Sequence, residues 1–64
     1  MLYCIDLKTN EIHVLGCRYI PSKHQDKNFL GRFNNPDDAI AEAKFKGFLD
    51  VNACFYCCFS TYMK

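Results

Sequence analysis

The sequence has little excess of either charge, no long apolar run and no phosphate-binding glycine motif. A formal net charge of +1 gives no whole-molecule argument for binding nucleic acid. No apolar segment approaches the roughly eighteen residues that a membrane-spanning helix needs, so no membrane association is expected. The chain also lacks a glycine-rich phosphate loop, a serine nucleophile elbow and a convincing pair of catalytic carboxylates. We therefore expect a protein that is not an enzyme.

The first ten residues, "MLYCIDLKTN", do not have the pattern of a secretory signal peptide. They lack a basic n-region, and Asp6 and Lys8 interrupt the apolar run. We therefore expect a cytoplasmic protein, in which thiols stay reduced. In that compartment clustered cysteines bind metal more often than they form disulfides, and the odd count of five cysteines agrees with this.

The length of the chain predicts a single small domain over residues 1–64. Half of the residues are hydrophobic, so the composition is that of a globular protein and not of a disordered one. A core of this size is only marginally stable, and small scaffolds commonly add a disulfide, a metal or a partner subunit. The cysteines are therefore the first residues to consider.

The sequence predicts an α/β (α+β) fold that begins with a β-hairpin. Residues 2–6 ("LYCID") and 11–15 ("EIHVL") have strand composition, and "LKTN" supplies the turn. Residues 18–28 predict an irregular basic connection. Residues 29–33 ("FLGRF") predict a third strand, in which Gly31 would form a bulge or a close approach.

The segment "NNPDDAIAEAKFKGF" predicts one central helix with both ends marked. Asn35 is suited to the N-cap, Pro36 to the first helical position and Gly47 to a left-handed C-terminal cap. Phe45 projects from the polar side of this helix, so we expect it either to be covered by the C-terminal segment or to contact a partner. An aromatic stripe at Phe55, Phe59 and Tyr62 predicts a short C-terminal helix.

Two residue pairs with metal-ligand spacing predict a zinc site. Cys54-x2-Cys57 can bind one ion as the chain turns, and His13-x3-Cys17 supplies a second pair from the end of a strand. Three thiolates and one imidazole suit tetrahedral zinc and do not suit calcium or magnesium. Cys58 is an alternative to Cys57, because Cys54-x3-Cys58 is also sterically allowed. With four protein ligands, the zinc would be structural.

This pattern resembles the Ada-type metal-binding domain. That family has an early Cys/His-x3-Cys pair, a middle helix and a final CxxC pair, which match "IHVLGCRYI", "FNNPDDAIAEAKFKGF" and "ACFYC" over residues 12–58. The resemblance implies a small zinc-stabilised α/β fold. In the DNA-repair member, the first ligand is the methyl-accepting thiolate. Here that position is His13, and imidazole cannot replace the thiolate, so repair activity is not expected.

The sequence leaves three classes of function open. We favour a protein–protein interaction module that uses Phe45 as an anchor, because aromatic residues dominate interface energetics. A second hypothesis is a nucleic-acid module in which basic residues of the 18–32 segment meet phosphates, with Tyr19 or Phe29 stacking on a base. These basic residues are Arg18, Lys23, Lys27 and Arg32. A third is a thiol-redox protein that uses Cys54 and Cys57 as a reactive pair.

Overall fold

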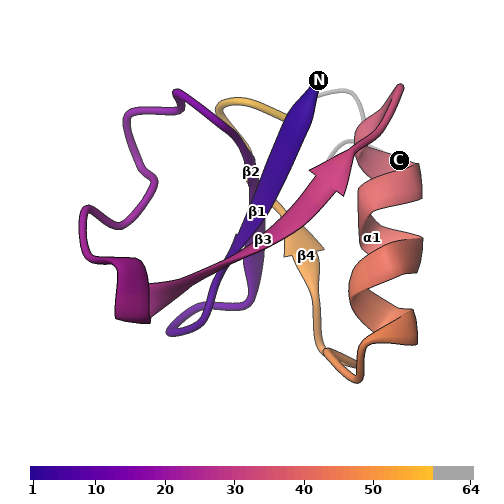
Figure 1. Cartoon of the computed structure of the whole chain (residues 1–64). Helices are drawn as coiled ribbons and strands as arrows, with labels where there is room; N and C mark the ends of the chain where they lie inside the picture. Colours follow the sequence, from indigo (N-terminus) through magenta and orange to yellow (C-terminus); the bar gives the residue numbers. More distant parts are fainter. Residues whose placement is uncertain (59–64) are drawn as a thin grey trace.

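Strands β1 and β2 form the N-terminal hairpin of the computed structural model, which describes residues 1–58 of the chain (Figure 1). β1 spans Leu2–Asp6 and β2 spans Glu11–Val14; they are antiparallel, with Ile5 opposite Ile12. Asn10 closes the turn with a φ of 60°, a left-handed conformation that asparagine tolerates better than most residues. The predicted hairpin is confirmed.

Strand β3, Lys27–Arg32, pairs antiparallel with the other edge of β1 and confirms the predicted third strand. It starts two residues earlier than the sequence predicted, directly after a short 3-10 helix, η1, at His24–Asp26. Its register shifts between Phe29, which faces Cys4, and Gly31, which faces Tyr3. Gly31 has a φ of 130°, so it forms the expected bulge in a conformation that favours glycine.

A fourth strand, β4, was not predicted from the sequence. It consists of Asn52–Ala53 and runs parallel to β2, which makes a mixed sheet with the order β3-β1-β2-β4. Asn52 donates its backbone N–H to the Asn10 carbonyl at 3.0 Å, and the following Cys54 donates to the Ile12 carbonyl at 2.9 Å. Two paired residues show no periodicity, so the sequence alone could not predict this strand.

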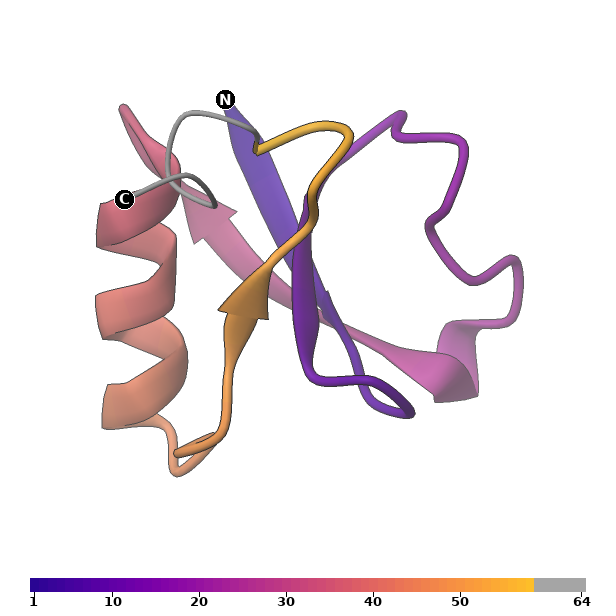
Figure 2. The same ribbon diagram turned by 180° about the vertical axis from the view of Figure 1, so that it is seen from behind.

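The central helix, α1, spans Pro36–Phe45 and lies against one side of the sheet (Figures 1 and 2). The Asn35 side chain accepts the Asp38 backbone N–H at 3.0 Å, which is the predicted N-cap. Gly47 follows the helix with a φ of 102°, as expected for the residue that ends it. The helix and the mixed sheet confirm the α+β class.

The core lies between α1 and the sheet, and small helix residues allow the close approach. Ala39 and Ala43 are fully buried, and their small side chains let the helix sit directly on the strands. Fully buried large side chains face them from β1 and β2. The buried core cluster consists of Tyr3, Ile5, Ile12, Leu30, Ala39, Ala43, Val51, Ala53 and Cys58.

The structure tests the predicted environment of Phe45 and the start of the predicted C-terminal helix. Phe45 is 88% exposed, so the expectation that the C-terminal segment covers it is wrong, and the alternative of an exposed side chain holds. The predicted C-terminal helix falls mainly on residues 59–64, which lie outside the described residues. Of its expected start, residues 55–57 form a turn.

Candidate metal centre

His13 and Cys17 are positioned by the end of β2 and the tight turn that follows it. His13 lies on the opposite face of β2 from Ile12, as strand alternation predicts, and both side chains are fully buried. The chain then turns at Gly16, whose φ is 101°. The Cys17 backbone N–H donates to the Val14 carbonyl at 2.9 Å, so Cys17 is held beside the strand that carries His13.

Cys54 and Cys57 are positioned by β4 and by one helix-like turn after it. The hydrogen bond from Cys54 N–H to Ile12 fixes the backbone of Cys54 beside β2. Cys58 N–H then donates to the Cys54 carbonyl at 2.9 Å, which closes a turn with the spacing of an α-helix. This turn brings Cys57 back toward the same end of β2.

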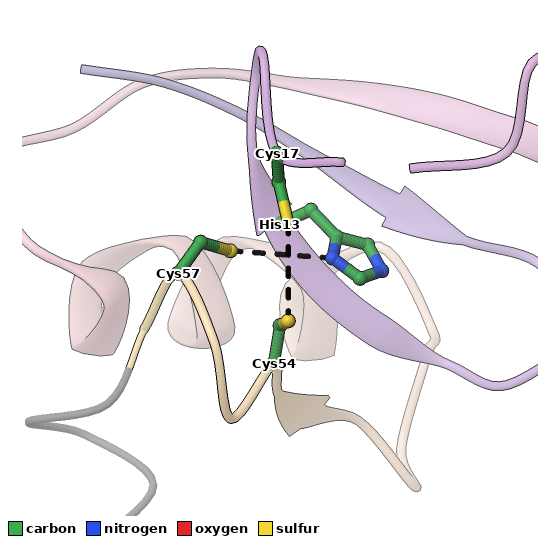
Figure 3. A group of neighbouring side chains, drawn as sticks. All are labelled: His13, Cys17, Cys54 and Cys57. Atoms are coloured by element: carbon green, nitrogen blue, oxygen red, sulfur yellow. Dashed lines mark hydrogen bonds between the residues drawn. The ribbon is translucent and has the colours of Figure 1, made fainter. Parts of the chain in front are cut away.

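The structure brings the four sequence-predicted ligands together, with all their ligand atoms within 4.8 Å of one another (Figure 3). Cys17 Sγ and Cys54 Sγ lie 4.0 Å apart, and Cys57 Sγ lies 4.0 Å from His13 Nδ1. A tetrahedral ion with metal–sulfur bonds of about 2.3 Å implies sulfur–sulfur edges of about 3.8 Å. The cluster is therefore close enough to hold a metal ion.

The surroundings of Cys57 also favour a ligand role. Val14 donates its backbone N–H to Cys57 Sγ at 3.3 Å. β4 ends at Ala53, so no further β4 residue pairs with Val14. The Cys57 sulfur accepts the Val14 N–H at this edge of the sheet instead. A hydrogen bond to sulfur stabilises the charged form that binds a metal.

Burial of His13 favours its neutral form, which is the form that binds a metal ion. Burial lowers the pKa of its imidazole, so the ring is neutral at pH 7 and its Nδ1 lone pair is available to an ion. Nε2 is buried and has no hydrogen-bond partner among residues 1–58. Many metal-binding histidines are oriented by a hydrogen bond from the second nitrogen, and residues 1–58 supply none to His13 Nε2.

Cys58 and Cys4 lie outside this four-residue group. Cys58 Sγ is 3.6 Å from Cys57 Sγ, but its thiol donates to the Ile12 carbonyl at 3.6 Å and the residue is buried in the core. Its position therefore favours Cys57 as the fourth ligand. Cys4 is 2% exposed and fills space on the sheet, as predicted for a small apolar side chain.

The geometry argues against a reactive thiol pair at Cys54 and Cys57. Burial raises the pKa of the Cys57 thiol, although the Val14 N–H partly opposes this effect. A redox-active cysteine needs a lowered pKa, which a helix N-terminus or a nearby cation commonly provides. Here the described residues after Cys54 form a single turn and no helix with such an N-terminus.

The basic residues predicted to contact a partner do not form one patch. Arg18 and Lys23 are exposed in the connection between β2 and η1. Lys27 is half-buried, and its Nζ donates to the Pro21 carbonyl at 2.9 Å. Arg32 lies at the opposite end of β3, so it is separated from Lys27 by the length of that strand.

A small cavity of about 220 Å³ lies beside this connection and is distinct from the metal centre. Its lining residues come from β1, β3, η1 and the turn after β2: Cys4, Leu15, His24, Lys27 and Phe29. None of the four clustered metal-ligand candidates lines it.

An exposed aromatic pair beside the cluster was not predicted. The rings of Tyr19 and Tyr56 stack with centroids 4.3 Å apart and planes inclined at 23°. Each tyrosine lies two positions after a ligand cysteine, Tyr19 after Cys17 and Tyr56 after Cys54. That repeated spacing is a signal for the pairing only once the two loops are known to meet.

Comparison with protein-family models, with curated proteins and with solved structures finds no match to this chain. The interpretation of the site therefore depends on its own geometry and chemistry. Within residues 1–58, no helix has the length and apolar character required to cross a bilayer.

Proposed function

We propose that the chain is a small zinc-stabilised binding module without catalytic activity. The observation that carries this proposal is the convergence of His13, Cys17, Cys54 and Cys57 at the joined ends of β2 and β4. Three sulfurs and one imidazole nitrogen are the donor set of structural zinc sites, and harder cations prefer oxygen. Four protein ligands leave no open position for a substrate, so the ion would serve stability.

The cysteine sulfurs of the proposed site also favour a location in a reducing compartment, such as the cytoplasm. All five cysteines are free thiols in the structure. Zinc binding requires thiolates, and oxidation of any ligand to a disulfide would remove it from the site.

The metal assignment is tested by the metal content of the protein as purified. Native mass spectrometry should give one zinc per chain, because the cluster provides one set of four ligands. The measurement should be made after expression without added metal and again after dialysis against equimolar zinc and iron. A folded, metal-free protein, or one that retains iron in preference to zinc, would contradict the proposal.

A protein partner is the binding function that we favour, and the end of α1 supports it. Phe45, the last residue of α1, is 88% exposed, and Leu49 in the turn after the helix is 76% exposed. Large exposed apolar side chains are typical of protein contacts. Lys44 and Lys46 flank Phe45, and Lys46 is paired with Glu42 at 3.8 Å, so this end of the helix carries both signs of charge. The complementary partner surface would therefore be an apolar pocket with a mixed polar rim.

Replacing Phe45 with serine is expected to remove partner binding and leave the fold intact. Because the side chain is almost fully exposed, the free energy of unfolding should change by no more than about 0.5 kcal/mol. Loss of an aromatic anchor weakens binding by roughly thirtyfold or more, which corresponds to about 2 kcal/mol. Quantitative affinity purification with Phe45→Ser measures this, with Lys44→Ser as a control on the same helix. Equal recovery of every protein by both variants would refute the Phe45 surface.

A further inference from the structure

The two loops that carry the candidate metal ligands both contribute rings to an exposed aromatic cluster. We call Tyr19, Tyr56 and the adjacent Phe55 the aromatic stack; Phe55 meets Tyr56 edge-to-face with centroids 5.4 Å apart. Tyr19 is 47%, Tyr56 66% and Phe55 42% exposed. None of the three belongs to the hydrophobic core cluster. Stacked rings that remain this exposed have apolar surface available to a ligand.

The contact between the two loops of the candidate metal centre also brings the two tyrosines together. Tyr19 and Tyr56 are far apart in sequence, and their loops meet because Cys17 and Cys54 approach to 4.0 Å. The stack thus lies where the two loops of the candidate metal centre meet.

Positive charge accompanies the stack on this side of the molecule. The Arg18 guanidinium lies 5.9 Å from the centre of the Tyr19 ring. Neither Arg18 nor Lys23 has an ion-pair partner within residues 1–58, whereas Asp26, the acid of this connection, is paired with Lys8 at 3.5 Å. The acidic first turn of α1 belongs to the opposite side of the sheet from the 15–26 connection (Figures 1 and 2).

We propose that the aromatic stack, together with Arg18, is a binding surface for single-stranded nucleic acid. The bases of an unpaired strand can stack on flat rings, and its phosphates can contact the adjacent guanidinium. In a duplex the bases are stacked on one another, so they cannot stack on these rings. The contacts that remain are mainly with phosphates. The site is separate from Phe45, so it does not depend on the protein partner proposed above.

The test is fluorescence anisotropy with a labelled single-stranded oligothymidylate and a duplex of the same length. Wild-type, zinc-loaded protein should bind the single strand with micromolar affinity at about 100 mM salt and bind the duplex at least tenfold more weakly. Tyr56→Leu should weaken single-strand binding by about tenfold or more, since stacking is lost while the ligands are untouched. The chain has no tryptophan, so quenching of tyrosine emission gives a second readout of stacking.

The matched charge variants are Arg18→Gln and Lys44→Gln. Arg18→Gln should weaken binding and reduce the salt dependence, whereas Lys44→Gln, on the exposed surface of α1, should have no effect. Zinc content and the circular dichroism spectrum of each variant must match the wild type, which separates loss of the surface from loss of the fold. Absence of single-strand binding, equal affinity for duplex, or unchanged binding by Tyr56→Leu would each overturn the proposal.

Discussion

Removal of zinc by a chelator at neutral pH is expected to unfold the domain. A hydrophobic core in so small a chain contributes only about 3–5 kcal/mol of net stability. The gross free energy of binding at a structural zinc site is about 10 kcal/mol, and most of it becomes folding free energy because the site does not exist in the unfolded chain. In the zinc-bound form that we propose, the four ligands would hold the ends of β2 and β4 together, so loss of the ion would release both loops.

Circular dichroism during chelator titration, followed by re-addition of zinc, measures this effect. The spectrum should change to that of an unfolded chain and recover when zinc is restored in excess. Native mass spectra of the same samples should show that loss of the ion and loss of structure occur together. A metal-free protein that still melts cooperatively at the original temperature would show that the cysteines are ordinary core residues.

Replacing Cys54 with alanine is expected to destabilise the domain far more than replacing Cys4 with alanine. Cys54 and Cys4 are each 2% exposed, so they lose the same kind of buried sulfur when replaced by alanine. Cys54→Ala removes one ligand and should abolish stoichiometric zinc binding and stable folding. Cys4→Ala should keep the metal and lower the free energy of unfolding by about 1 kcal/mol, from lost packing alone.

Thermal melting and metal content of the two variants provide the comparison. For Cys4→Ala, a loss of this size lowers Tm by about 4–8 °C for a domain of this length. Similar melting and metal content in both variants would show that burial alone determines the cysteine effects. Loss of zinc from Cys4→Ala would instead assign Cys4 a role in the metal centre.

The elements that could be predicted from sequence are those determined by local chemistry. Asn35 and Gly47 mark the ends of α1 because capping and positive φ depend on the residue at one position. The candidate ligand group could also be predicted, because CxxC and HxxxC spacings are each typical of a pair of metal ligands. Alternation along β2 correctly separated His13 from Ile12.

The features that were missed depend on residues distant in sequence. β4 is a strand only because Asn52 and Ala53 lie beside β2, and neither residue has a strong strand preference. The exposure of Phe45 depends on whether another segment covers it, which helical periodicity cannot show. The pairing of Tyr19 with Tyr56 likewise required the two ligand loops to be placed first.

The pairing of β4 with β2 also affects the stage of synthesis at which the domain can complete its folding. A nascent chain that ends at Gly47 already contains the hairpin, β3 and α1, but only His13 and Cys17 of the four ligands. Two ligands cannot complete a tetrahedral site. We therefore expect the final strand to dock and the ion to bind in the same step, after Cys57 has left the ribosome. Until then, the open edge of β2 is exposed to chaperones and to the β-strands of other chains.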